Sequence, residues 1–332
     1  MAAQKDSTEQ SAPAKSKIDT VFRDFIEKGG RFEPQAGEHP FVSPGSAVFD
    51  LLSKFIRANR LTIHSAWAHR TLILRKLKGL EDIIPVTIVS PMLGPQGWPF
   101  ASVLPFPGAD VDPLYNSKHI KDLYLKANPE YSARFSVPVL WDKQNHTIVN
   151  NESSEIIRMF NSAFNDLLPP EKAALDFYPA DLRTKIDEIN EWVFSDINSG
   201  VYRAVFSKTQ SAYEKVVYEI FAALDKVEVI LTGKDYLVGD QLTEADIRLY
   251  VTAIRFDPVY VGLFKCNIRT IRDGYPAIHK WLQKLYWNND VFKATTDFEH
   301  IKTNYYASDS LISNNNPTKI IPVGPVPHIR PL

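Results

Sequence analysis

Two short segments of this chain could hold a small charged ligand. The dipeptide Val137–Pro138 precedes a hairpin whose turn is Asp142–Asn145. Proline cannot donate a hydrogen bond to a sheet, so Pro138 indicates a strand edge or a special turn, often with a cis bond. Glu152 and Ser153 then begin a helical pattern. A helix N-terminus attracts a carboxylate and a glutamate beside it can pair with an ammonium group, although an ordinary capped helix is the alternative.

Hydrophobic spacing predicts the elements that position these segments. An amphipathic helix is expected at Arg70–Leu80, with Gly79 as a glycine stop near its last turn. A first strand can be placed only at Leu61–His64, and a buried strand is expected at Ile83–Val89. A helix at Lys118–Asn128 and then the hairpin with its following helix complete the set. This is the order of a thioredoxin-like domain. Ser90–Asp110, with five prolines, is expected to be an irregular surface loop.

From Pro169 onward the pattern changes to helices. Tyr213–Val227 carries its apolar residues on one stripe, as a buried helix face requires. Thr243 and Asp246 have the spacing of a capping box, and Pro276 is expected to open a further helix. The sequence therefore predicts a second domain that is entirely helical.

Composition limits the classes of protein to which the chain can belong. Its 332 residues suffice for two domains with buried cores, and a formal net charge of −1 gives no indication of a nucleic-acid or membrane partner. No apolar run approaches the roughly 18 residues of a membrane span. Cys266 is the single cysteine, which excludes a disulfide within one chain and fits a reducing compartment. Residues 1–16 lack the features of a targeting peptide and are expected to form a disordered tail.

The stretch Asn128–Phe160, NPEYSARFSVPVLWDKQNHTIVNNESSEIIRMF, resembles the glutathionyl-hydroquinone reductases. These enzymes are the Xi class of glutathione transferases and are related to the Omega class. The resemblance runs from about Asp19 to Pro325 with one break, and Leu242–Ile247 resembles the folding cap of the transferase helical domain. It implies an α/β plus all-α protein with the glutathione transferase fold. The implied parts are a thioredoxin-like domain at 17–165, a helical domain at 166–310 and an extended tail at 311–332.

The resemblance assigns several residues to glutathione. Glu152 and Ser153 match the pair that holds the γ-glutamyl end of the tripeptide. The backbone of Val137 and Pro138 matches the edge that pairs with the cysteinyl part, in the manner of β-augmentation. Arg134 matches an arginine that contacts the tripeptide's carboxylate or closes the pocket.

Aromatic residues are assigned to ring contacts in the same way. Trp98, within a Gly/Pro loop, matches a tryptophan that packs over glutathione. Tyr202 matches a tyrosine that faces the hydroquinone, and Tyr305 or Tyr306 matches a second, with Tyr306 preferred. Phenol hydroxyls can donate to a quinol oxygen while their rings stack on it. Without the family context, a loop anchor and buried core tyrosines would be the simpler interpretation.

The pattern fails at the residue that the chemistry needs. The reductases begin their first helix with Cys-Pro-Trp-Ala-His-Arg, whereas Ser65–Arg70 reads Ser-Ala-Trp-Ala-His-Arg. The cysteine thiolate attacks the glutathionyl sulfur and forms a mixed disulfide, which Ser65 cannot do. Cys266 matches a position in the helical domain and is not expected to substitute. Upstream, the atypical insert Glu38–His64, partly with helical spacing, stands where the family has an aromatic-rich strand.

Three accounts of this break are open. In the first, the segment Glu38–His64 comes from a mistaken gene model, such as a retained intron. In the second it belongs to a real isoform, and in the third it marks a paralogue that lost the reductase chemistry. Because the break is abrupt and the matching is good on both sides, the gene-model account is favoured.

The resemblance implies the function. It is glutathione-dependent reduction of glutathionyl-hydroquinones by thiol–disulfide exchange, in a cytoplasmic homodimer that binds glutathione and quinone-type molecules. With Ser65 in place, the alternatives are serine-type glutathione conjugation, or non-catalytic binding of glutathione or quinones. His64 and His69 lack the spacing of a metal site, so no metal is expected.

Overall fold

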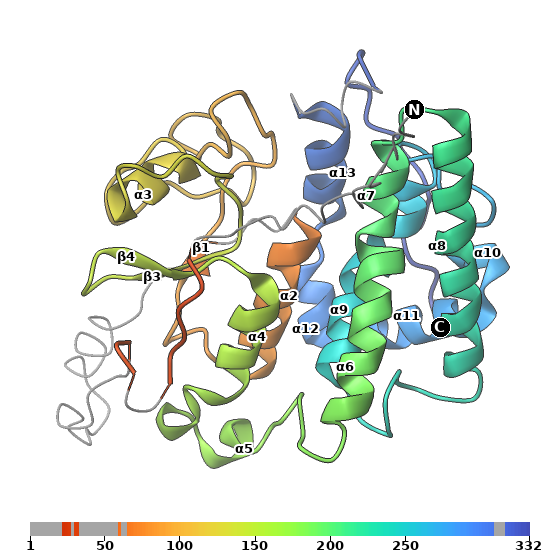
Figure 1. Cartoon of the computed structure of the whole chain (residues 1–332), viewed down its shortest axis with the longest axis horizontal. Helices are drawn as coiled ribbons and strands as arrows, with labels where there is room; N and C mark the ends of the chain where they lie inside the picture. Colours follow the sequence, from red (N-terminus) through yellow and green to blue (C-terminus); the bar gives the residue numbers. More distant parts are fainter. Residues whose placement is uncertain (1–21, 28–29, 33–58, 61–64, 309–315) are drawn as a thin grey trace, which may run out of the picture.

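A small α/β layer and a larger group of helices lie side by side in this protein (Figure 1). The computed structural model describes residues 22–27, 30–32, 59–60, 65–308 and 316–332. The expected tail at 1–16, the expected strand at Leu61–His64 and most of the insert at Glu38–His64 lie outside the described residues.

The α/β layer is built on one four-stranded sheet. Its elements are β1 (Asn59–Arg60), α2 (Ala66–Leu77), β2 (Val86–Thr87), α3 (Ile120–Ala127), β3 (Val139–Asp142), β4 (Thr147–Asn150) and α4 (Ser153–Ser162). The strand order is β2-β1-β3-β4, with β1 parallel to β2 and the other pairs antiparallel. Helices α2 and α4 pack together, and Figure 1 shows α3 on the other side of the sheet. This is the predicted thioredoxin-like arrangement, with its first strand at β1.

Helix α2 confirms the predicted helix and begins four residues before Arg70. Ser65 occupies the N-cap position, and Ala66 and Ala68 are buried. The predicted start came too late because it depended on large apolar side chains, and the first turn of the helix buries small ones. At the other end Gly79 has φ +70°, and its N–H donates to the carbonyl of Lys76 while that of Leu80 donates to Arg75. These two bonds form the Schellman motif, which favours glycine at this position.

The buried strand predicted at Ile83–Val89 is shorter than expected. Only Val86–Thr87 pairs in the sheet. The N–H groups of Ile83 and Ile84 instead donate to the carbonyl of Leu80, which continues the turn after α2. Pro85 has no N–H to donate, so pairing starts after it.

The loop between β2 and α3 is irregular, as predicted, but it is not only surface. Ser90 and Phe100 are fully buried. The Ser90 N–H donates to the carbonyl of Pro99 at 2.8 Å, and the Ile120 N–H donates to that of Trp98 at 2.9 Å. These bonds fix the Trp98 segment against the start of α3.

The helical part begins after a 3₁₀ turn at Asn165–Leu167. Its helices are α5 (Pro170–Ala173), α6 (Arg183–Trp192), α7 (Gly200–Val205), α8 (Gln210–Leu231), α9 (Glu244–Arg255), α10 (Ile271–Gly274), α11 (Pro276–Asn288), α12 (Asp290–Thr295) and α13 (Phe298–Ala307). Two π-helical stretches, η2 (Val193–Asn198) and η3 (Phe256–Tyr260), interrupt the α-helical geometry. Among the described residues, no helix is long and apolar enough to cross a membrane.

Three predicted features of the helical part are confirmed. The apolar stripe Tyr213–Val227 lies within α8. Thr243 and Asp246 form the capping box of α9, in which the Asp246 carboxylate accepts from the Thr243 N–H at 3.0 Å. Pro276 is the first residue of α11.

The C-terminal segment 316–332 contains no helix or strand, and it packs on the helical part. The Arg272 guanidinium donates to the backbone carbonyls of Pro327 and His328, both at 2.9 Å. The His328 ring stacks on Phe298 with 4.3 Å between centroids. The segment therefore holds the starts of α10 and α13.

The larger apolar core continues from the α/β layer into the helical part. Helix α2 packs on α4 in its own layer and on α9 and α12 across the boundary. His69 is buried at this boundary, where its Nδ1 lies 3.1 Å from an Arg255 guanidinium nitrogen and its Nε2 lies 3.3 Å from the Thr295 hydroxyl. The two parts therefore share one interior along α2.

Candidate functional site

A cavity of about 790 Å³ opens between the sheet layer and the helical part. Nearly all of the residues that the sequence assigned to a site line it: Ser65, Trp98, Arg134, Val137, Pro138, Glu152, Ser153, Tyr202 and Tyr305. The structure thus brings together residues that are up to 240 positions apart in the chain, from Ser65 to Tyr305.

The N-terminus of α4 forms one wall of the cavity. Glu152 is its N-cap, and the Glu152 carboxylate accepts from the Ser154 N–H at 3.1 Å. The Ser153 hydroxyl, which is buried, lies 3.3 Å from the same carboxylate oxygen. The capped end of α4 is therefore also the end that borders the cavity, and the two interpretations from the sequence do not exclude each other.

The segment before β3 forms a second wall. The Val137–Pro138 peptide bond is cis, and β3 begins at Val139. Within the described residues no hydrogen bond uses the backbone N–H or carbonyl of Val137, so both groups can pair with a ligand. Trp98, half-buried in its anchored loop, lines the same side.

Ser65 lies where the N-terminus of α2 meets the cavity. Its backbone has the N-cap conformation, but its side chain makes no capping hydrogen bond. Ser65 thus occupies the N-cap position without capping the helix through its hydroxyl. Ser65 and Trp67 line the cavity at the N-terminus of α2, and a helix N-terminus is favourable for a developing negative charge.

Arg70 contacts three residues around the cavity, namely Asn198, Ser153 and Trp67. It is fully buried, donates to the Asn198 side-chain carbonyl at 3.0 Å, and has a second nitrogen 3.5 Å from the Ser153 hydroxyl. Its guanidinium lies 4.5 Å from the centre of the Trp67 ring. Burial, and then the charge of Arg248, lowers the pKa of Arg70 to about 9. Arg70 thus fixes Trp67 and the start of α4 relative to η2.

Two tyrosines meet at the helical side of the cavity. The Tyr202 and Tyr305 hydroxyls are 2.7 Å apart, and Tyr260 lies behind them with its hydroxyl 3.1 Å from that of Tyr305. Burial, followed by the proximity of Tyr305, raises the pKa of Tyr202 well above its ordinary value. The Tyr202 phenol is therefore protonated near neutral pH and can act as a hydrogen-bond donor.

The preference for Tyr306 over Tyr305 is not supported by the geometry. Tyr306 does not line the cavity, and its hydroxyl donates to the carbonyl of Pro258 at 3.3 Å. Consecutive residues on a helix point about 100° apart, so only one of the two can face the cavity. In α13 that residue is Tyr305.

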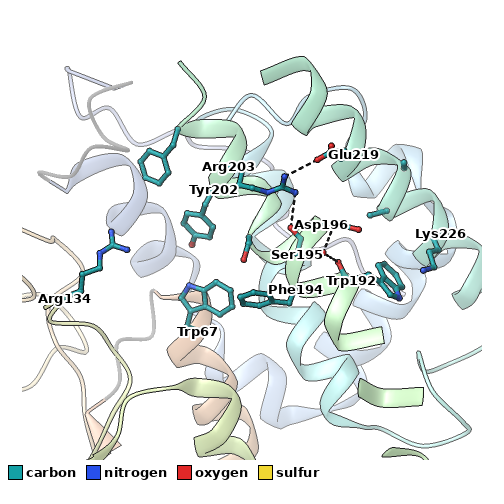
Figure 2. A pocket seen from close by; sticks show the side chains of 14 residues that line it. Trp67, Arg134, Trp192, Phe194, Ser195, Asp196, Tyr202, Arg203, Glu219 and Lys226 are labelled. Carbon is teal, nitrogen blue, oxygen red and sulfur yellow. Dashed lines mark hydrogen bonds and ion pairs between the residues drawn. The ribbon is translucent and has the colours of Figure 1, made fainter. Parts of the chain in front are cut away.

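Sequence reasoning missed Phe194. This residue lies in the π-helical stretch η2, is 50% exposed, and packs against Trp67 with 5.6 Å between ring centres (Figure 2). A π-helical stretch changes the direction of the side chains around it, and no sequence signal announced one here. Trp67 was visible only as part of the matched SAWAHR run.

Cys266 does not contribute to the cavity. It is fully buried and its thiol lies 3.9 Å from the carbonyl of Phe264. Burial raises the pKa of the Cys266 thiol to about 12, so it stays protonated and unreactive near neutral pH. In the described part of the chain, no three side chains are grouped as metal ligands.

The sequence and the fold match one group of known proteins. Residues 64–163 match the glutathione S-transferase N-terminal domain family, and residues 210–284 match the glutathione S-transferase C-terminal domain family. The glutathione-S-transferase Xi from Phanerochaete chrysosporium is 57% identical with a TM-score of 0.85, over 94% of this chain and 97% of that one. The chain belongs to the Xi class of glutathione transferases.

Two further Xi-type relatives bear on the site. The glutathionyl-hydroquinone reductase YqjG of Escherichia coli is 50% identical over 78% of this chain and 76% of its own length. The Xi transferase ECM4 of Saccharomyces cerevisiae, solved in complex with glutathione, is 43% identical with a TM-score of 0.82, over 94% of this chain and 99% of that one. Glutathione is therefore bound by ECM4 in that structure. The cavity of about 790 Å³ described above lies within the size range of small-molecule sites.

Proposed function

We propose that this Xi transferase binds glutathione conjugates of hydroquinones, in a site built for the reaction of the glutathionyl-hydroquinone reductases. The single observation that supports this best is the convergence of two groups on one cavity. The α4 N-terminus and the free Val137 backbone suit a tripeptide, and the Tyr202–Tyr305 pair beside them suits a quinol. Glu152 and Ser153 hold the γ-glutamyl end, Arg134 and Trp98 close over the tripeptide, and the tyrosines face the ring.

The reduction has a definite requirement at position 65. A thiolate there attacks the glutathionyl sulfur, the aromatic C–S bond breaks, and its electron pair takes a proton at the ring carbon to give the hydroquinone. A second glutathione then attacks the protein–glutathione disulfide, which releases glutathione disulfide and restores the thiolate. The phenol of Tyr202 or Tyr305 can hydrogen-bond the quinol oxygen during the first step. Ser65 forms no such disulfide, so in the chain with serine the cavity can bind and orient the conjugate but cannot carry out this reduction.

The decisive experiment compares the native chain with Ser65→Cys on glutathionyl-menadiol. A cysteine at the α2 N-terminus gains a lowered thiol pKa from the helix end. We expect Ser65→Cys to raise the rate of hydroquinone release by about two orders of magnitude or more, with Ser65→Ala unchanged from the native chain. If Ser65→Cys binds the conjugate but stays inactive, the proposed reductase geometry is wrong.

Sequencing the transcript across codons 30 to 75 complements this assay. A message that encodes Cys-Pro-Trp-Ala-His-Arg would make the natural protein an ordinary reductase. A message that encodes Ser65 as written leaves conjugation or binding as the native role.

A second candidate function rests on the free hydroxyl of Ser65. Because this hydroxyl makes no capping bond and lines the cavity, it can donate to the thiolate of bound glutathione and lower its pKa. The native chain would then conjugate glutathione to 1-chloro-2,4-dinitrobenzene, and Ser65→Ala would lose that activity. Equal rates for the two proteins would exclude this function and leave non-catalytic binding.

Assembly and location are further parts of the proposal. The resemblance implies a homodimer that acts in the cytoplasm on quinone-type molecules. Exposed Phe194 and Phe206, 50% and 48% accessible in one chain, support an apolar contact or ligand surface beside the cavity. Sedimentation of the purified protein would separate a dimer from a monomer.

A further inference from the structure

A second, larger hollow adjoins the glutathione cavity. It has a volume of about 1410 Å³ and lies along η2, α7 and α8. The residues that line both spaces are Trp67, Arg134, Phe194, Ser199 and Tyr202. Since the two spaces share these side chains, the hollow continues from the place where the quinol ring is proposed to lie.

The hollow has an aromatic wall. Figure 2 shows Trp67, Phe194 and Trp192 in a row that leads away from Tyr202. Trp67 is held from behind by Arg70, and it packs against Phe194. At the far end the Lys226 ammonium lies 3.9 Å from the centre of the Trp192 ring. Apolar rings aligned in a concave surface bind flat aromatic groups well.

The charged side chains around the hollow include one ion pair. Arg203 pairs with Glu219 at 3.1 Å, and Asp196 accepts from the Ser195 hydroxyl at 2.5 Å. Lys226 makes no ion pair within the described residues. An electron-rich, oxygen-bearing ring would therefore find aromatic contact at the Trp192 end, together with the Lys226 cation that lies over the Trp192 ring.

We infer that this hollow is an extension of the acceptor site that takes a second aromatic ring of the substrate. The inference rests on the proposed function and names its substrate class: glutathione conjugates whose hydroquinone is joined to a further aryl group. Phe194 lies at the junction of the two spaces, so it determines how the second ring enters. A one-ring quinol would occupy the first space alone.

The test uses stable thioethers, so it does not depend on turnover at Ser65. Isothermal titration compares glutathione, S-benzylglutathione and S-(4-phenylbenzyl)glutathione on the full chain. We expect the second ring to tighten binding by about tenfold, because it buries against the aromatic wall. Ala222→Trp, at an exposed position of α8 that lines the hollow, should abolish that gain and leave glutathione and S-benzylglutathione unchanged.

Val229→Trp is the matched control. Val229 is 76% exposed on the same helix and does not line the hollow, so the tenfold gain should persist. Trp192→Leu is a second variant, which removes an aromatic ring from the wall of the hollow instead of filling the hollow. It should also reduce the gain in affinity from the second ring.

Three results would overturn the inference. The first is that the second ring does not tighten binding, and the second is that the tighter binding survives both Ala222→Trp and Trp192→Leu. The third is that Ala222→Trp changes the oligomeric state because a second copy of the chain covers the hollow. Loss of glutathione binding by the native chain would instead contradict the proposed function itself, so the two failures are distinguishable.

Discussion

Glu152 is a residue at which stability and binding depend on the same atoms. Its carboxylate caps α4 by accepting from the Ser154 N–H, and it also borders the cavity. A carboxylate at a helix N-terminus stabilises the helix through the cap and through the helix dipole. The charge that stabilises the helix is the one proposed to pair with the ammonium group of glutathione.

Substitutions at Glu152 can separate these two contributions. Glu152→Gln keeps an oxygen that accepts from Ser154, so the free energy of unfolding should change by less than about 0.5 kcal/mol. The same variant loses the negative charge, and we expect its Kd for glutathione to rise about tenfold. Glu152→Ala should lose about 1 kcal/mol of stability as well. Titration calorimetry and urea unfolding measure both effects, and native affinity in Glu152→Gln would exclude the proposed ion pair.

Helix α2 is the element that is buried against both parts of the molecule. His69 lies on its inner face near Arg255 of α9 and Thr295 of α12. Burial, and then the charge of Arg255, lowers the pKa of His69 well below its ordinary value. Its imidazole is therefore neutral in the folded protein, with Nδ1 accepting from the Arg255 guanidinium.

This contact predicts a pH dependence of stability. In the unfolded chain His69 binds a proton below about pH 6.5, whereas in the folded protein it does not. The unfolded state therefore gains protons as the pH falls, and stability is lost below about pH 6.5. His69→Gln should reduce that slope by up to about 1.4 kcal/mol per pH unit, measured by urea unfolding between pH 7 and pH 5.

His146→Gln, at the exposed turn between β3 and β4, is the control for the loss of one histidine away from α2. An unchanged slope in His69→Gln would mean that His69 is protonated in the folded protein.

The elements that the sequence predicted well have strong local signals. The Schellman glycine after α2, the capping box of α9 and the proline that opens α11 all depend on neighbouring residues. The features that it missed depend on distant contacts. Nothing near Phe194 indicated a π-helical stretch, and the choice between Tyr305 and Tyr306 required the packing of α13 against Tyr202. The site residues were identified through the family resemblance, since their types alone fit ordinary caps and core aromatics.

At the scale of the whole molecule, the shared core predicts one cooperative unfolding transition. The apolar cluster that contains residues of α2 and α4 also contains those of α8, α9 and α11. Opening the boundary would expose the fully buried Arg70 as well as this apolar surface. Neither part can therefore unfold without disrupting the other.

Calorimetry checks this expectation. We expect a single endotherm with equal calorimetric and van't Hoff enthalpies. Glutathione at about 100 times its Kd should stabilise the whole protein by about 2.7 kcal/mol and shift the entire endotherm upward. Two peaks, of which glutathione moves only one, would show that the parts unfold independently.

The two-sided burial of α2 also constrains how proteins of this kind can be recombined. A chimera that exchanges the thioredoxin-like half for that of another transferase would place a foreign α2 against α9 and α12. That foreign helix would have to supply partners for Arg255 and Asn198, which contact His69 and Arg70 in this protein. A functional exchange would transplant the sheet elements on both sides of α2 and leave α2 itself with the helical half. It therefore needs a crossover before and after this helix in addition to the one at the domain boundary in the sequence.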